Sequence, residues 1–299
     1  MTREHKSTSD QGLDFDLFPM RLFQKAKKLG IWNPADIDFT QDRKDWLGFT
    51  ELEQEALLNL TAVFLGGEES VTLDLLPLIM AIAQEGRLEE EMFLTSFLWE
   101  EAKHVEAFRR FIDEVTHDKS DLSRFYTPSY HKIFFDELPT AMNRLRTDQS
   151  PEAQAIASVT YNMIVEGTLA ETGYHAYLEI LEEKDLMPGM REIIAHLNRD
   201  ESRHIAYGVY LLSRLTAEHG QEVWPAIEAR MGEMLVYALD MIEEIFARYE
   251  VFPFGLTIEP FVDYAMKQFE RRFTRISKAL EHTPEELHKI HEGYEGAAE

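Results

Sequence analysis

Residues 94–111 carry an apolar helix face that is interrupted by one glutamate and one histidine. At 3.6 residues per turn, this face consists of Leu94, Phe97, Leu98, Glu101, His104, Val105, Phe108 and Phe111. Because an apolar face is buried in a folded protein, Glu101 and His104 are predicted to lie inside, where an unpaired charge is very costly. Other groups or ligands must therefore compensate them.

The same pattern occurs a second time. Glu100-Glu101-Ala102-Lys103-His104 is matched by Asp200-Glu201-Ser202-Arg203-His204, an acidic–Glu–x–basic–His sequence in both places. Positions i and i+3 lie on one side of a helix, about one turn apart. Glu201 and His204 therefore also share an apolar face, here with Ile194, Leu197, Ile205, Gly208 and Leu211.

Each copy follows a helix that carries one more carboxylate on an apolar face. Glu68 shares its face with Phe64, Leu65, Val71, Leu75 and Ile79, and Glu166 shares its face with Val159, Met163, Leu169, Ala170 and Gly173. Glu69 is the alternative to Glu68, but its face is less uniformly apolar, so Glu68 is preferred. The pattern is thus one Glu on one helix and Glu-x-x-His on the next, twice over.

This duplication predicts a dinuclear metal site. One Glu from each of two helices and one Glu-x-x-His from each of two others are the ligands with which four-helix bundles hold two metal ions. A single buried Glu-x-x-His is more often an internally hydrogen-bonded pair, but that explanation does not account for two matched copies. Two divalent cations would neutralise the four buried carboxylates. Oxygen ligands with one imidazole per metal favour iron or manganese over structural zinc.

Most of the chain has the spacing of long amphipathic helices. They are expected over residues 51–85, 87–116, 129–146, 151–184, 188–219, 221–249 and 258–281, with a short one from about 284. No segment alternates as a strand does, so the fold class is predicted to be all-α. No Gly/Ser linker divides the chain, and we expect a single domain over residues 1–299, with a polar N-terminal arm (about 1–14) and an acidic C-terminal tail (about 283–299).

Composition excludes several classes of protein. The net charge of −25 argues against nucleic acid or an anionic membrane surface as the main partner. The longest apolar run, residues 75–83, is too short to span a bilayer. The chain has no cysteine, which excludes disulfides and thiolate metal sites and fits a cytoplasmic location. The acidic run Glu89-Glu90-Glu91 is expected to be a solvated helix start.

The N-terminal region resembles that of ribonucleotide reductase small subunits. The resemblance lies in residues 32–39 (Trp-Asn-Pro-Ala-Asp-Ile-Asp-Phe) followed by Asp42 and Trp46, and with both Glu-x-x-His segments it spans roughly residues 20–250. The usual small subunit has its radical tyrosine four positions after the first histidine, where this chain has Phe108. Some small subunits with a manganese/iron centre also have phenylalanine there.

A closer resemblance is to the ligand-binding oxidases that are related to those subunits. They carry Gly-Glu-Glu-x-Val on the first ligand helix, as at residues 67–71 here, and a tyrosine five positions before the third carboxylate, as Tyr161 precedes Glu166. The resemblance implies a ferritin-like four-helix bundle with additional helices, a homodimeric assembly, and an oxygen-activating centre with one manganese and one iron. A di-iron centre is the alternative.

Specific roles follow from this resemblance alone. Glu68, Glu101 and His104 would hold manganese, and Glu166, Glu201 and His204 would hold iron, with Glu101 bridging. Val71 and Tyr161 would be joined by an ether cross-link when the metals react with molecular oxygen. A long-chain fatty acid, or a similar apolar ligand, would bridge the metals through its carboxylate. The function implied is a two-electron oxidase.

Helix geometry supports part of this assignment. Val71 lies one turn from Glu68 on the same face, although a valine on a core face needs no special explanation. Tyr161 is about 140° around an ideal helix from Glu166, and it reaches the site only if that helix contains a π-bulge. The alternative for Tyr161 is a core tyrosine that bonds elsewhere. Tyr174 and His175 are candidates for supporting groups, although plain packing is favoured for both.

Three other functions compete with the oxidase. Iron storage is disfavoured because storage proteins of this plan are typically shorter. A radical-generating small subunit of ribonucleotide reductase would need a C-terminal docking tail with a tyrosine, and Tyr294 keeps that alternative open. A non-catalytic lipid carrier, with metals serving only as an anchor, would consume no oxygen.

Overall fold

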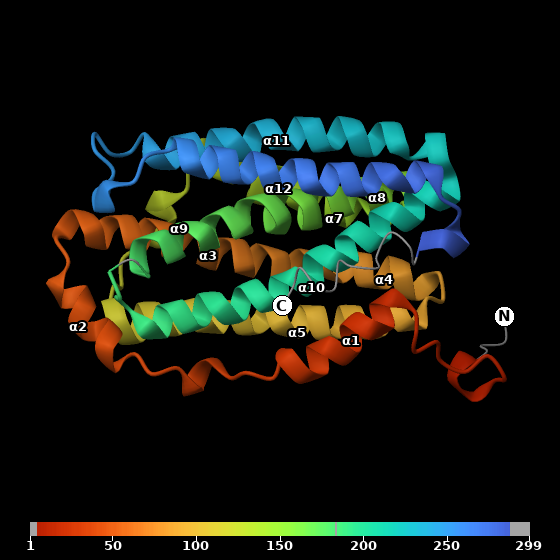
Figure 1. Ribbon diagram of the computed structural model, residues 1–299, viewed down its shortest axis with the longest axis horizontal. Coiled ribbons are helices and arrows are strands. Elements are labelled where there is room, and N and C mark those ends of the chain that lie inside the picture. The colour runs from red at the N-terminus through yellow and green to blue at the C-terminus, as the bar shows by residue number, and fades with distance from the viewer. Residues whose placement is uncertain (1–4, 183, 288–299) are drawn as a thin grey trace.

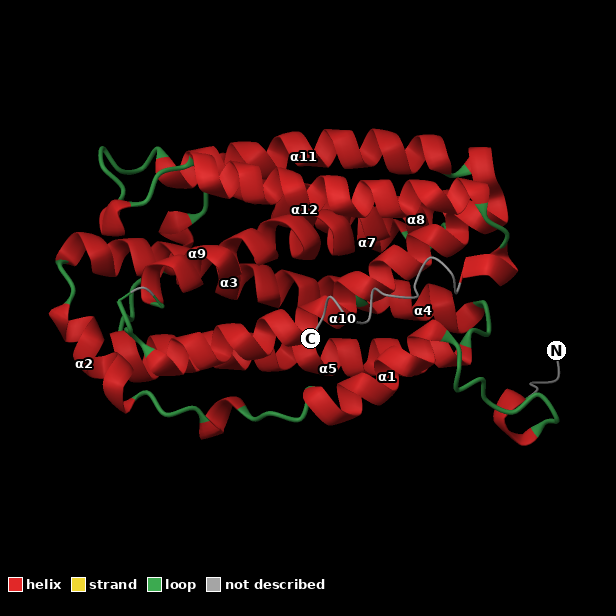
Figure 2. Ribbon diagram, in the orientation of Figure 1, coloured by secondary structure: helices red, strands yellow, loops and turns green. Residues whose placement is uncertain are grey.

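The computed structural model describes residues 5–182 and 184–287, and in these ranges the chain forms helices and no strand (Figures 1 and 2). The predicted all-α class is confirmed. The C-terminal segment with Tyr294, and most of the acidic tail, lie outside the described residues. No helix in the described part of the chain is long and apolar enough to cross a membrane.

Four helical segments form the bundle and run along the long axis of the molecule (Figure 1). They are α3 (Glu51–Asp74), α5 (Leu88–Phe111), the continuous segment α8 (Pro151–Ser158), η6 (Val159–Ala170) and α9 (Glu171–Leu181), and α10 (Pro188–His219). Helix α3 packs on α5, and α10 packs on η6 and on α5. Each of these segments carries one of the carboxylate or Glu-x-x-His motifs.

Further helices surround this bundle. They are α1 (Phe18–Leu29), α2 (Thr40–Gly48), α4 (Leu76–Gln84), α6 (Pro128–His131), α7 (Leu138–Arg144), α11 (Trp224–Phe246) and α12 (Glu259–Ser277), with π-helical segments η3 (Ile112–Thr116) and η5 (Lys132–Glu137). Short 3₁₀ turns are η1 (Lys6–Thr8), η2 (Pro34–Asp36), η4 (Leu122–Phe125), η7 (Gly220–Glu222), η8 (Pro253–Gly255), η9 (Lys278–Glu281) and η10 (Pro284–Glu286). Helices α11 and α12 both pack on η6 and cover one side of the bundle (Figure 1).

Helix ends follow local chemistry. Thr50 and Glu53 form a capping box at the start of α3, and Ser150 caps α8 ahead of Pro151. The helix expected over residues 51–85 is divided into α3 and α4 at Leu75, because Pro77 has no N–H to donate and its ring blocks a continuous helix.

Two helices near the N-terminus were not predicted. Helix α1 buries Phe18, Leu22 and Ala26, which are spaced four residues apart, and it packs on α5. Helix α2 is only nine residues long and buries Asp42 and Trp46. Both are short, and their stability comes from packing on the bundle more than from their own sequences.

The segment η6 departs from the α-helical hydrogen-bond pattern over twelve residues, Val159–Ala170. Its register is visible at Thr168, whose hydroxyl donates to the carbonyl of Met163, five residues earlier (2.8 Å). The wider turn changes which side chains face the bundle interior. The π-helical turn of η6 is the feature that Tyr161 requires in order to point toward the same place as Glu166.

The expectation that Glu89-Glu90-Glu91 is a solvated helix start is wrong for its first two residues. The Glu89 carboxylate is buried and pairs with Lys6 Nζ (2.6 Å). Glu90 is also buried and accepts a hydrogen bond from the Tyr207 hydroxyl (3.0 Å). These partners are distant in sequence, so the local charge pattern gave no indication of them.

Candidate metal centre

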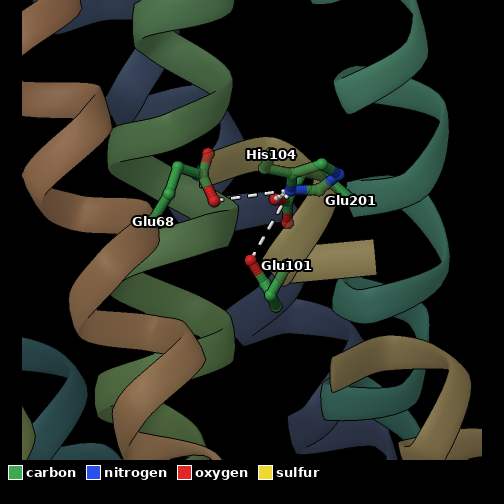
Figure 3. A group of neighbouring side chains, drawn as sticks. All are labelled: Glu68, Glu101, His104 and Glu201. Atoms are coloured by element: carbon green, nitrogen blue, oxygen red, sulfur yellow. Dashed lines mark ion pairs between the residues drawn. The ribbon is translucent and has the colours of Figure 1, made fainter. Parts of the chain in front are cut away.

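The structure brings all six predicted ligand residues together in the bundle interior. Two groups of side chains offer ligand atoms within 4.8 Å of one another; they are Glu68, Glu101, His104 and Glu201 in the first, and Glu101, Glu166, Glu201 and His204 in the second. Figure 3 shows the first group, with Glu68 reaching across from α3 toward His104 and Glu201. Glu69, the alternative to Glu68, is exposed. The cluster can therefore bind two metal ions.

Both histidines direct the same ring nitrogen into the cluster. His104 Nδ1 lies 3.4 Å from Glu68 Oε2, 3.5 Å from Glu101 Oε2 and 3.4 Å from Glu201 Oε1 (Figure 3). His204 Nδ1 lies 3.3 Å from both Glu101 Oε1 and Glu201 Oε2, and 3.6 Å from Glu166 Oε1. Glu101 and Glu201 thus lie between the two histidines, which is the position that a bridging carboxylate requires.

The polar atoms of the cluster are buried, and only some of them are hydrogen-bonded. Five of them make none to any described residue, namely Glu101 Oε2, His104 Nδ1, Glu166 Oε1, Glu201 Oε2 and His204 Nδ1. Buried polar atoms are almost always satisfied in folded proteins. Their convergence on two points, together with a donor set of carboxylates and imidazoles, fits a pair of divalent cations.

Proton affinities in the cluster are displaced from their ordinary values. Burial raises the pKa of Glu68 to about 8. Burial, followed by repulsion from Glu201, raises the pKa of Glu166 well above its usual range. Burial opposes protonation of His104, but attraction to Glu68 together with hydrogen bonding to Asp200, Glu101 and Glu201 outweighs it and raises the pKa of His104. Without a cation, the cluster therefore holds protons where metal ions would bind.

The outer nitrogen of each histidine contacts an acidic residue of the opposite motif. His204 Nε2 lies 2.9 Å from Glu100 Oε2, and His104 Nε2 lies 3.4 Å from Asp200 Oδ2. A carboxylate behind a ligating imidazole fixes the ring and increases its basicity. These two carboxylates are fully buried. Both belong to the repeated motif, but the repeat alone does not indicate this role.

Basic residues of the same motifs neutralise these carboxylates. Arg203 Nη2 donates to Glu100 Oε1 (2.6 Å) and to Asp200 Oδ1 (2.5 Å). Lys103 Nζ donates to Asp200 Oδ2 (3.2 Å), as does the indole nitrogen of Trp32 (2.8 Å). In each acidic–Glu–x–basic–His repeat, the Glu and His belong to the cluster, and the acidic and basic residues hold the histidines from behind.

Tyr161 reaches the cluster from η6. Its hydroxyl lies 3.2 Å from Glu101 Oε1 and 3.2 Å from the backbone carbonyl of Val71. Tyr161 and Val71 are both buried, and Val71 is on α3 one turn beyond Glu68. The π-helical register of η6 thus places the tyrosine beside the valine and a cluster carboxylate at once.

Other candidate residues differ in position. The Tyr174 hydroxyl lies 3.4 Å from both Glu68 Oε1 and Glu201 Oε1, so Tyr174 contacts the cluster although packing alone was favoured for it. His175 instead stacks on Tyr264, away from the cluster. Phe108 is buried and stacks on Phe64. Asn162, which was not predicted, donates to Glu166 Oε2 (2.9 Å).

An apolar cavity of about 110 Å³ adjoins the cluster. Glu68, Glu166 and Glu201 line one part of it, and its other walls are almost entirely apolar side chains of α3, η6, α9, α11 and α12. On α3 the lining runs from Val71 back to Ala56. At about 1.5 Å per residue, the distance along the helix from Glu68 to Ala56 is roughly 18 Å. The cavity thus has one polar end, and the rest of its lining is apolar.

Known proteins are similar to this chain over most of its length. The family model for the ribonucleotide reductase small chain matches residues 20–276. The crystal structure of an R2-like ligand-binding oxidase from Sulfolobus acidocaldarius is 40% identical, with a TM-score of 0.87, and the match covers 95% of this chain and 98% of that chain.

Two variants of an R2-like ligand-binding oxidase are also similar. One has a tyrosine replaced by phenylalanine and an aerobically reconstituted Mn/Fe cofactor, and the other has a valine replaced by alanine and an anaerobically reconstituted Mn/Fe cofactor. Each is 39% identical, with a TM-score of 0.86, and the match covers 92% of this chain and 98% of that chain.

Proposed function

This chain belongs to the ribonucleotide reductase small chain family and, within it, to the R2-like ligand-binding oxidases, and on this basis we propose that it is an oxygen-activating Mn/Fe oxidase. We infer that it binds a long-chain fatty acid or a similar apolar ligand and forms an ether cross-link between Tyr161 and Val71. The observation that carries the proposal is the Tyr161 hydroxyl, which lies 3.2 Å from both a cluster carboxylate and the Val71 carbonyl.

The substituted residues of the solved relatives support this pair. A third solved variant of an R2-like ligand-binding oxidase has a glycine replaced by phenylalanine. The replaced glycine, valine and tyrosine of these variants are separated by the same intervals as Gly67, Val71 and Tyr161 here. Gly67 and Val71 both line the apolar cavity. The three positions thus surround the place where the cluster, the cavity and the tyrosine meet.

The six clustered residues would hold the metals. Manganese would bind Glu68, Glu101 and His104, and iron would bind Glu166, Glu201 and His204, with Glu101 bridging. Fe²⁺ binds nitrogen and oxygen ligands more tightly than Mn²⁺, so a mixed pair requires the protein to distinguish its two positions. A di-iron pair is the alternative.

The proposed cross-link has a simple balance. Loss of the Val71 Cβ–H and the Tyr161 O–H, with formation of a C–O bond, releases two electrons and two protons. When bound, the divalent metal pair would supply O₂ binding and the other two electrons that reduce O₂ to two waters, with two further protons taken from the solvent. Glu101, which contacts the Tyr161 hydroxyl, is placed to accept the phenolic proton.

The cavity would hold the ligand. The carboxylate of a fatty acid would lie at the polar end, beside Glu68, Glu166 and Glu201, and its tail would lie among the apolar walls. A filled cavity would keep water from the reacting groups. We also expect a homodimer, to be checked by light scattering of the purified protein.

A radical-generating small subunit of ribonucleotide reductase is the competing function. Family membership favours it as well, but the position of the usual radical tyrosine is occupied by Phe108, which stacks on Phe64 and Tyr177 and has no hydroxyl. Reductase activity with a catalytic subunit would decide for this alternative.

The test is mass spectrometry of the intact protein and its peptides before and after aerobic loading with Mn²⁺ and Fe²⁺. The proposal expects a loss of two hydrogens that maps to a linked peptide pair containing Val71 and Tyr161. An unchanged mass at verified metal occupancy would contradict the cross-link. Oxygen consumption measured on the same samples distinguishes an oxidase from a lipid carrier.

A further inference from the structure

We propose that Glu100 and Asp200, the carboxylates behind the two histidines, determine which metal position takes iron and which takes manganese. The inference rests on the proposed function, because it presupposes a mixed metal pair at the six clustered residues. It assigns a role in metal selection to two residues that contact no metal themselves.

The two histidines differ in the hydrogen bonds behind them. Glu100 uses one oxygen, Oε2, for His204 Nε2 at 2.9 Å, while Arg203 binds the other oxygen at 2.6 Å. The oxygen that contacts His204 therefore has no competing donor among the described residues. Because Glu100 is fully buried, bulk solvent does not compete for it either.

Asp200 is engaged differently. Its oxygen Oδ2 faces three donors, of which Trp32 Nε1 is at 2.8 Å, Lys103 Nζ at 3.2 Å and His104 Nε2 at 3.4 Å. The histidine is the most distant of the three. Arg203 Nη2 binds the other oxygen, Oδ1, at 2.5 Å. Asp200 thus pairs with one lysine and one arginine, whereas Arg203 is the only lysine or arginine that pairs with Glu100 among the described residues.

This difference makes the two imidazoles unequal ligands. A carboxylate that accepts from the outer N–H increases the basicity of the metal-binding nitrogen. The effect is larger at His204, whose bond to Glu100 is shorter and unshared, than at His104. Fe²⁺ gains more than Mn²⁺ from a stronger nitrogen donor. Iron is therefore expected at the His204 position, which leaves manganese at the His104 position.

Two substitutions separate these contributions. Glu100→Gln keeps the size of the side chain but removes the charge behind His204, so the iron-to-manganese ratio at the His204 position should fall. Lys103→Met removes one competitor for Asp200 Oδ2, so the ratio at the His104 position should rise. Since changes to groups behind metal ligands alter metal affinity by about 10–100-fold, we expect changes in the ratio of about tenfold. Glu106→Gln, an exposed change on the same helix, is the matched control.

The experiment loads each protein anaerobically with equal concentrations of Mn²⁺ and Fe²⁺ and crystallises it. Anomalous diffraction at the manganese and iron absorption edges then gives the occupancy of each metal at each position. Circular dichroism and total metal content establish that each variant is folded and loaded. In the unmodified protein and the control, we expect iron at the His204 position and manganese at the His104 position. Glu100→Gln should lower the iron-to-manganese ratio at the His204 position, and Lys103→Met should raise that ratio at the His104 position.

Two outcomes overturn the inference and are distinguishable from failure of the proposed function. In the first, the unmodified protein holds iron and manganese at distinct positions, and neither folded variant changes their occupancy. That result would exclude Glu100 and Asp200 as determinants of metal selection but would not contradict the proposed oxidase function. A change confined to the opposite metal position would reverse the assignment. An unmodified protein that binds no metal pair at all would instead contradict the proposed function itself.

Discussion

Gly30 lies so close to Glu100 that a Cβ atom at position 30 would overlap the carboxylate oxygen Oε1. The backbone of Gly30 has φ −83° and ψ 3°, which any residue can adopt, so the requirement for glycine here comes from contact and not from conformation. The end of α1 is thereby coupled to the carboxylate behind His204.

Gly30→Ala is expected to displace Glu100 from Arg203 and His204. Overpacking at a buried site costs about 1–3 kcal/mol, so the free energy of unfolding should fall by that amount. Binding of the metal pair should also weaken. Urea denaturation and metal titration check both effects. Gly232→Ala, at an exposed position within α11 with no atom within 4 Å of the added Cβ, should instead stabilise the protein by about 0.5–1 kcal/mol.

Tyr161→Phe should abolish the mass loss on aerobic metal loading, because the variant lacks the oxygen that would form the ether. Metal content should be nearly unchanged, since the hydroxyl is not among the clustered ligand atoms. Tyr177→Phe is the matched control, because the hydroxyl of Tyr177 contacts Thr61 and not the cluster. A full loss of two hydrogens in Tyr161→Phe would show that another residue reacts.

Metal binding should release protons. Burial raises the pKa of Glu68 to about 8 from an ordinary 4.5, and the pKa of His104 is raised by attraction to Glu68. At pH 7 this pair holds at least one proton, and Glu166, whose pKa burial also raises, holds another, so the metal pair must displace these protons. The apparent affinity should therefore rise as the pH increases from about 6 to above 8.

Calorimetry in buffers of different ionisation enthalpy measures this release directly, under anaerobic conditions. We expect more than one proton per metal pair at pH 7. Glu69→Gln should behave like the unmodified protein, because Glu69 is exposed. Heats that do not depend on the buffer would show that the cluster is already deprotonated.

The raised pKa of Glu68 also affects the stability of the metal-free protein. The folded state holds a proton on Glu68 that the unfolded chain releases above about pH 4.5. The free energy of unfolding should therefore decrease as the pH rises from about 4.5 to 8, and Glu68→Gln should reduce that dependence. Thermal unfolding across this range, with metals removed by chelation, provides the measurement. A dependence that Glu68→Gln leaves unchanged would assign it to other groups.

Ala176→Phe should obstruct the apolar cavity. Ala176 is on α9, lines the cavity and is not among the clustered ligand residues. We expect loss of bound fatty acid, measured by extraction and mass spectrometry, with metal content retained. Ala229→Phe makes the same change at an exposed position of α11 and should retain the ligand. Retention by both variants would place the ligand outside this cavity.

Helical periodicity predicted the bundle because the apolar faces of α3, α5 and α10 are long and regular. It also predicted which acidic residues point inward, such as Glu68 over Glu69, since a shift of one residue rotates a side chain by about 100°. The short helices α1 and α2 were not predicted because most of their stabilising contacts come from the rest of the fold.

Other features depend on contacts that no local pattern contains. The sequence shows that Tyr161 can reach the cluster only if its helix has a π-helical turn, but it does not predict that turn. Side-chain spacing assumes a regular α-helical turn, which η6 does not have. Glu100 and Asp200 were visible in the repeat, but their exchange of partners between α5 and α10 requires the two helices to be placed side by side. Burial of Glu90 likewise depends on Tyr207, a residue of α10.

The cavity has walls of two origins. Its polar end is built by helices that carry the clustered carboxylates, whereas residues 241–261 of α11, α12 and their connection supply seven of its apolar lining residues and none of the clustered ones. Substitutions in residues 241–261 can alter which ligand fits the cavity without changing the residues that would bind the metal ions. Related chains can therefore diverge in specificity by exchanging one contiguous stretch, and a chimera that carries residues 241–261 of another member should inherit its ligand together with an intact metal centre.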